Sequence, residues 1–168
     1  MGKVERTLPK VKMLPGEKHR ERVLPTDDEV FYLKGASSAA MMQFADPNLV
    51  RDVATILLDC GLRPEDCFRL RVENAAEGKV EVHVGKTEYA RRRIPVTPRV
   101  RAILEMRLSD VKSGWVFSAA TKSGHIEPSS LKKQHARALV EATQLLREER
   151  KSADVQIDPF ELDTLRHN

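Results

Sequence analysis

The sequence predicts a mainly helical domain of the α+β class that carries one small antiparallel β-hairpin. Apolar residues recur at helical spacing in several segments of the 168 residues, and residues 79–84 alternate between apolar and polar side chains. Prolines, glycines and capping residues separate these segments. Hydrophobic residues make up 40% of the chain, which is enough for one core, and only 5% are aromatic. The expected core is therefore mainly aliphatic.

Start signals place the first two helices. Residues 26–29 read Thr-Asp-Asp-Glu, a capping box that predicts a helix from Thr26 toward Gly35. Asp46-Pro47 combines an N-cap residue with a proline at the first helical position. From there to residue 58 the chain is apolar around most of a helix circumference, so we expect a buried central helix that ends at Gly61.

The second half of the chain predicts the hairpin and two further helices. Residues 79–84 form its first strand and residues 91–96 its returning strand. Thr97-Pro98 caps a helix with apolar residues near a spacing of 3.6. A long helix is expected from Ser129 to about Glu149, and Asp158-Pro159 begins a last element.

Composition excludes several classes of protein. The net charge is +4, with 29 basic and 25 acidic residues, which permits binding to nucleic acid without requiring it. Cys60 and Cys67 form no CxxC pair, so neither a disulfide scaffold nor a structural zinc site is expected. No window approaches the ~20 apolar residues of a membrane span. We expect a cytoplasmic, nucleoid-associated protein. Residues 1–25, rich in Lys, Arg and Pro, indicate a basic arm or linker, or equally a solvated chain end.

Three basic clusters are candidates for function. Arg63 follows the end of one predicted helix and precedes another, a placement that holds a guanidinium for phosphate; it could instead pair with Glu65, Asp66 or a carbonyl. The hairpin tip carries Lys86 and the run 91–93 of three arginines, which indicates either contact with a phosphate backbone or a sheet edge protected by charge. The third cluster, the Leu-Arg-His of residues 165–167, is weak by itself.

Together these segments resemble the catalytic domain of tyrosine recombinases of the phage-integrase kind. GLRPEDCFRLRVENA is similar to the first arginine box of that family, a T/C-G-L-R-x-x-E-L-x-x-L-x-W-x-D pattern. GKVEVHVGKTEYARRRIPV is similar to its lysine-bearing hairpin, and DTLRHN resembles the opening of its second box, H-x-L-R-H-T. The resemblance covers residues 26–168, which would be part of an integrase catalytic domain, and the arm would match the linker before it.

The resemblance implies a mechanism for site-specific DNA integration or excision. Arg63 and Arg166 would bind the non-bridging oxygens of the scissile phosphate. Lys86 would protonate the departing 5′ oxygen as general acid. A tyrosine would form a covalent 3′-phosphotyrosyl intermediate. Neither metal nor another cofactor is implied, and the partners are double-stranded DNA and further copies of the full-length protein assembled on it.

The resemblance also extends to residues around this site. Asp163 stands where the family usually has histidine, and on a helix it would lie near Arg166. It would position that arginine, accept a proton, or mark a degenerate enzyme. Contacts with DNA are expected from the following basic residues: Arg91, Arg92, Arg93, Lys122, His125 and His167. For Lys122 and His125 the alternative is an ordinary exposed loop, and for His167 it is a packing role.

The sequence departs from the family in its tyrosines. Only Tyr32 and Tyr89 are present, and neither follows the second box. We therefore expect the nucleophile to lie outside this chain, which alone would be inactive. A non-catalytic DNA-binding module, derived from a decayed or truncated integrase, is the alternative function. A helical interaction domain with an ordinary basic surface is a third.

Overall fold

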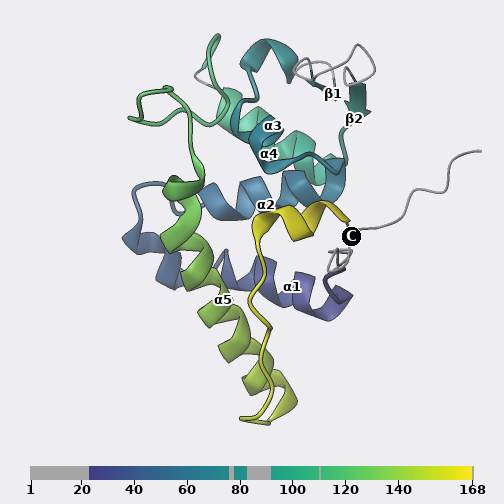
Figure 1. Ribbon diagram of the computed structural model, residues 1–168, viewed down its shortest axis with the longest axis vertical. Helices are drawn as coiled ribbons and strands as arrows, with labels where there is room; N and C mark the ends of the chain where they lie inside the picture. The colour runs from purple at the N-terminus through teal and green to yellow at the C-terminus, as the bar shows by residue number, and fades with distance from the viewer. Residues whose placement is uncertain (1–22, 76–77, 83–91, 110, 168) are drawn as a thin grey trace, which may run out of the picture.

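The computed structural model describes residues 23–75, 78–82, 92–109 and 111–167, and it confirms the predicted fold class (Figure 1). The α-helices are α1 (Thr26–Gly35), α2 (Leu49–Cys60), α3 (Pro64–Phe68), α4 (Pro98–Leu108) and α5 (Pro128–Arg150). Short 3₁₀ helices are η1 (Ala39–Gln43), η2 (Val72–Asn74) and η4 (Leu162–His167), and the strands are β1 (Lys79–Val82) and β2 (Arg92–Pro95). No helix within these ranges is long and apolar enough to span a bilayer.

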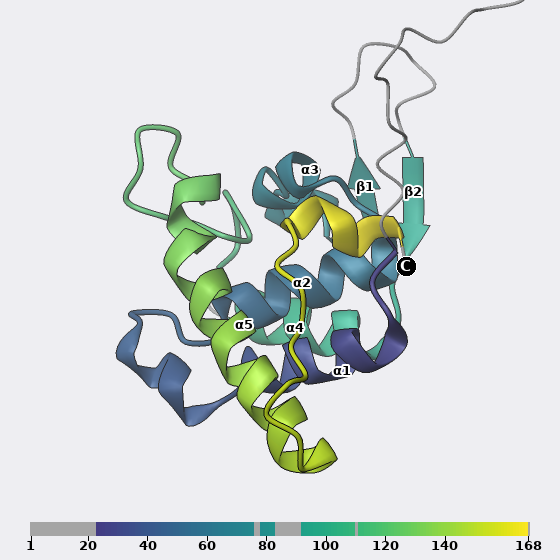
Figure 2. The same cartoon turned by 60° about the horizontal axis from the view of Figure 1, so that its bottom comes forward.

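Helix α2 lies at the centre of the core, as its apolar circumference predicts. Val50, Val53 and Ile56 are fully buried, and α1, α3, α4, α5 and η4 all pack against this helix (Figures 1 and 2). The helix ends at Gly61, whose φ of 58° places it in the left-handed region where a residue without a side chain is unstrained. The predicted C-terminal stop is thus confirmed.

The N-caps predicted for the first two helices, α1 and α2, are wrong by a few residues. Thr26 is already helical, and the first helical hydrogen bond runs from Glu29 N to the Pro25 carbonyl at 3.0 Å, so the Thr26 hydroxyl caps nothing. Helix α2 begins at Leu49 rather than at Pro47. The Asp46 carboxylate instead accepts a hydrogen bond from Asn48 N at 3.2 Å, an Asx turn that precedes the helix.

The two predicted strands pair antiparallel. Val80 pairs with Ile94 and Glu81 with Arg93. Val80 and Val82 are buried, as the alternation requires. Residues 83–91, which include the predicted turn and Lys86, lie outside the described part of the chain.

A glycine allows α1 and α5 to touch. A Cβ atom at Gly35 would lie 2.5 Å from the Ala138 carbonyl oxygen and 2.6 Å from Ala142 N, both backbone atoms that cannot rotate away. We expect Gly35→Ala to force the two helices apart and to lower the free energy of unfolding by about 1–3 kcal/mol.

Urea unfolding followed by circular dichroism measures this effect. Lys34→Ala, an exposed change on the same helix, serves as the control and should stay within about 0.5 kcal/mol of the parent. Equal stability of Gly35→Ala and the parent would mean that the two helices do not pack as closely as described.

Candidate functional site

Arg63 sits on a connection whose backbone is held from both sides. Gly61 closes α2 and fully buried Leu62 anchors the turn. Arg63 then serves as the N-cap residue of α3 with extended backbone, and its carbonyl accepts a hydrogen bond from Cys67 N at 3.1 Å. Its side chain is exposed. The backbone is therefore fixed while the guanidinium reaches solvent.

The two acids that follow Arg63 are engaged elsewhere. Glu65 lies 3.5 Å from Arg69, and Asp66 lies 3.6 Å from Arg92 of the hairpin. Among the described residues, none forms an ion pair or side-chain hydrogen bond with Arg63. Neither Glu65 nor Asp66 is therefore the partner of Arg63.

Arg166 lies on η4 beside Asp163. Its Nε atom is 2.8 Å from Asp163 Oδ1, because residues three apart eclipse one another in a 3₁₀ helix. The predicted proximity is confirmed. The Nε–H is not directed at that oxygen, and Nε has no hydrogen-bond partner within the described ranges. The Arg166 side chain is 26% exposed, and the Asp163 carboxylate lies at the Nε edge of its guanidinium.

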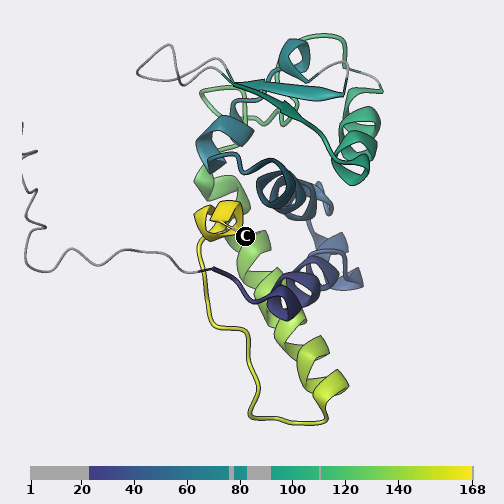
Figure 3. The same ribbon diagram turned by 90° about the vertical axis from the view of Figure 1, so that its right-hand side faces the viewer.

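The segments that carry the two arginines meet. A Cβ atom on Gly61 would lie 3.8 Å from the Arg166 carbonyl oxygen, and η4 packs along α2. Figures 2 and 3 show η4, in yellow, next to the start of α3 on one face of the molecule. Arg63 and Arg166, about 100 residues apart in the sequence, therefore project from adjacent backbone.

Solved structures share this fold. No family model and no curated protein sequence matches the chain. The integrase of transposon Tn1549, solved with circular intermediate DNA, aligns with a TM-score of 0.63 and 14% identity over 92% of this chain and 54% of its own. For XerA recombinase the TM-score is 0.58 and the identity 18%, over 96% of this chain and 50% of that one. An altered Tn1549 integrase on a circular intermediate DNA gives 0.60 and 16%, over 92% and 53%.

The chain has the fold of a tyrosine-recombinase catalytic domain. It spans about half the length of the recombinases that it matches. At these identities the likeness is one of fold alone.

In this recombinase fold the hairpin arginines lie close to α3. Arg92 and Arg93 are exposed on β2. Arg92 makes the ion pair with Asp66 described above, and Arg93 Nε lies 2.9 Å from Glu81 on the opposite strand. Lys86 and Arg91 fall outside the described residues, so their predicted roles remain predictions.

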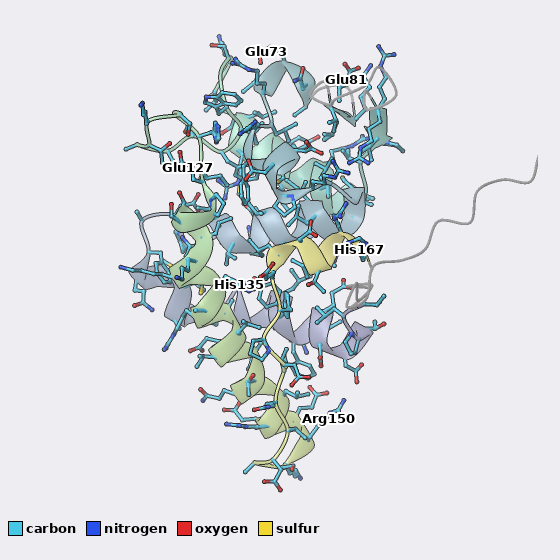
Figure 4. All side chains as sticks on the ribbon, viewed as in Figure 1. Glu73, Glu81, Glu127, His135, Arg150 and His167 are labelled. Atoms are coloured by element: carbon cyan, nitrogen blue, oxygen red, sulfur yellow. The ribbon has the colours of Figure 1, made fainter. Side chains whose placement is uncertain are left out.

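The remaining predicted DNA contacts differ in accessibility. Lys122 is exposed on its loop, and His167 is exposed at the end of η4 (Figure 4). His125 is only 7% exposed. Its Nδ1–H donates to the Ile126 carbonyl at 2.7 Å, and its ring meets Trp115 edge to face. A covered ring offers no surface to DNA, so His125 acts here as a packing residue.

A hydrogen-bonded chain through His135 holds the segment that leads to η4, and sequence reasoning missed it. The Tyr32 hydroxyl lies 2.6 Å from His135 Nδ1, and His135 Nε2 lies 2.7 Å from the carbonyl oxygen of Phe160. These partners are 103 and 25 residues apart in the sequence, so no local pattern could have revealed them. Figure 4 shows His135 beside the extended segment.

Burial lowers the pKa of His135 below its usual 6.5. A neutral ring accepts from Tyr32 and donates to Phe160, whereas a protonated ring must be charged inside the core. Because the folded state binds this proton less well, His135 stabilises the fold above pH ~6.5, and that stability is lost as the pH falls through the lowered folded-state value.

We therefore expect the melting temperature to fall more steeply below pH ~6 in the parent than in His135→Gln. Tyr32→Phe is the control: it removes one hydrogen bond but leaves the ring buried, so the steep acid branch should persist. Calorimetry over a pH series measures both. Parallel curves for the parent and His135→Gln would rule out this contribution.

The structure describes no group of three or more His, Cys, Asp or Glu side chains that could hold a metal ion among its placed residues. Cys60 and Cys67 are buried free thiols. Burial raises the pKa of Cys60 to about 11 and also raises the pKa of Cys67. Both therefore stay protonated and weakly reactive at neutral pH.

Proposed function

We propose that this chain is the phosphate-binding part of a recombinase that cuts and rejoins DNA at specific sites during integration or excision of a mobile element. The observation that carries the proposal is the meeting of the Gly61–Arg63 turn with η4 on one face of a recombinase fold. Two guanidiniums from distant sequence segments are thus available to a single phosphodiester.

The two arginines would act electrostatically. Arg63 carries a charge with no acidic partner among the described residues, and a phosphate accepts the planar guanidinium through two parallel hydrogen bonds. Arg166 keeps its terminal nitrogens for the same phosphate while Asp163 holds its other edge. Both charges would bind most tightly when negative charge grows on the non-bridging oxygens in the transition state.

The covalent step would use a tyrosine. Its hydroxyl would give its proton to Asp163 or to solvent as it attacks phosphorus; a bond forms between the phenolic oxygen and the 3′ phosphate, and the bond between phosphorus and the 5′ oxygen breaks. Lys86 would give its proton to that leaving oxygen, and the reverse reaction rejoins a strand. Tyr32 is fully buried and bonded to His135, so we assign it no attack. The attacking residue would be neither Tyr32 nor Tyr89, and this chain alone would not cleave.

A DNA-binding module without cleavage is the second candidate. The Asp163–Arg166 ion pair favours it, because a carboxylate beside the phosphate repels the substrate unless the arginine outweighs it. Under either candidate function the partner would be double-stranded DNA. Assembly of several copies on DNA is expected only if the protein is a recombinase.

Salt dependence tests DNA binding. We expect the parent to bind duplex DNA with an affinity that falls steeply with salt. Replacement of Arg91, Arg92 and Arg93 by alanine should reduce the slope of log K against log salt by about 0.9 for each phosphate that the hairpin no longer neutralises. Fluorescence anisotropy with a labelled duplex measures this slope.

The matched control removes three charges from the far end of the molecule. Arg147, Arg150 and Lys151 lie at the end of α5, away from the hairpin (Figure 4). Their replacement by alanine should leave the slope unchanged. If both triple variants shifted the slope equally, the hairpin would have no specific part in binding. Absence of any binding to duplex DNA would refute both candidate functions.

A further inference from the structure

A hollow lies beside the first turn of α3, just after Arg63. It has a volume of about 230 Å³. Buried Leu70 and Val82 contribute apolar surface to it, and the first turn of α3, η2, β1 and Trp115 surround it. The other side chains around it, Trp115 apart, are polar or charged. A hollow that combines apolar and polar surface fits a flat heteroaromatic group.

One wall of this hollow is a stacked pair. The Arg71 guanidinium carbon lies 4.2 Å from the centroid of the Trp115 ring. The backbone holds both residues, because they form an antiparallel bridge and Val116 N donates to the Leu70 carbonyl at 2.9 Å. The edge-to-face contact with His125 braces the indole from another direction. The wall is thus formed before any ligand arrives.

The polar side chains around the hollow can form hydrogen bonds with a DNA base. The side-chain amide of Asn74 lines the hollow and makes no hydrogen bond to any residue that the structure describes, so it offers both a donor and an acceptor. Glu65, Asp66 and Glu81 also line it, but each carboxylate pairs with an arginine, namely Arg69, Arg92 and Arg93 in that order. Nucleic acid can therefore approach without net repulsion.

We propose that this hollow binds one unpaired, extrahelical DNA base next to the phosphate held by Arg63 and Arg166. A paired base is stacked inside the duplex and cannot enter a hollow, whereas an unpaired base can stack on Arg71 and Trp115. This inference rests on the proposed function, because it supposes DNA on this face.

The experiment uses two duplexes of one sequence, one with a single unpaired adenine and the other with an abasic residue at the same place. The chain has one tryptophan, so its emission reports on Trp115 directly. We expect the unpaired adenine to quench this emission and to bind about tenfold more tightly than the abasic partner, the effect of one stacked base. Anisotropy measures both affinities.

Variants assign the preference to the hollow. Arg71→Lys keeps the charge but loses the planar stack, and Asn74→Ala removes the amide; each should reduce the tenfold preference to about twofold or less while binding of the abasic duplex stays within about twofold. Arg101→Lys, at an exposed position on α4, is the matched control and should keep the preference.

The possible outcomes distinguish failure of the base site from failure of the proposed function. Salt-dependent binding with equal affinity for both duplexes, or a preference that survives Arg71→Lys and Asn74→Ala, overturns the base site and leaves the proposed function standing. No binding to either duplex overturns both. Preference with quenching that both variants abolish supports both.

Discussion

Arg166→Ala is expected to slow DNA cleavage by about 10²- to 10³-fold, the usual loss when one charge-stabilising donor is removed from a transition state. Under the proposed function, this rate is measured in a preparation that cleaves DNA. Single-turnover formation of the covalent protein–DNA adduct gives the rate, and anisotropy gives the affinity for uncut DNA. Arg63→Ala should behave similarly, because both guanidiniums would hold the same phosphate.

The loss of cleavage rate, compared with the loss of affinity for DNA, shows whether Arg166 acts in the transition state. A group that acts in the transition state loses rate far beyond affinity, whereas a simple backbone contact loses both equally. Asp163→Asn keeps a side chain of similar size next to Arg166 and should cause a smaller loss if Asp163 only positions the arginine. Arg101→Ala, on α4, is the control and should leave the rate unchanged. Equal losses of rate and affinity in Arg166→Ala would contradict a catalytic role.

Arg107→Ala is expected to cost about 3–5 kcal/mol of folding free energy, because it strands a buried carboxylate. Asp52 is fully buried on α2, and Arg107 of α4 contacts its Oδ2 at 2.7 Å. The same guanidinium reaches Asp46 at 2.9 Å and lies 4.9 Å from the centroid of Phe117. One side chain thus joins α2, α4 and the segment before α2.

Chemical denaturation measures this loss. Arg51 also contacts Asp52 at 2.7 Å, and this second partner places the expected loss toward the lower end of the range. Arg137→Ala removes an exposed pair with Glu141 four residues along α5 and is the control, with an expected loss of about 0.5 kcal/mol or less. A loss below about 1 kcal/mol in Arg107→Ala would show that Asp52 is solvated or otherwise satisfied.

Much of the fold could be predicted because local signals decide it. The apolar circumference of α2, its stop at Gly61, the alternation in β1 and the Thr97 cap each act within a few residues. The Thr97 hydroxyl accepts a hydrogen bond from Val100 N at 3.3 Å, as the Thr-Pro pair predicts. The N-caps of α1 and α2 were predicted wrongly. The side chains of Thr26 and Asp46 can each accept a hydrogen bond from more than one backbone N–H, and the sequence does not show which one they use.

For the candidate site, the order of the residues establishes which cations are present and where the chain turns to present Arg63. The partners of these cations follow from how the helices pack. The tertiary structure pairs Asp66 with Arg92 of the hairpin, places η4 against the turn at Gly61, and buries His125. Most of this pairing and burial joins segments that are distant in the sequence, as the bonds of His135 to residues 103 and 25 positions away show, whereas helix ends and strand alternation depend on neighbours in the chain.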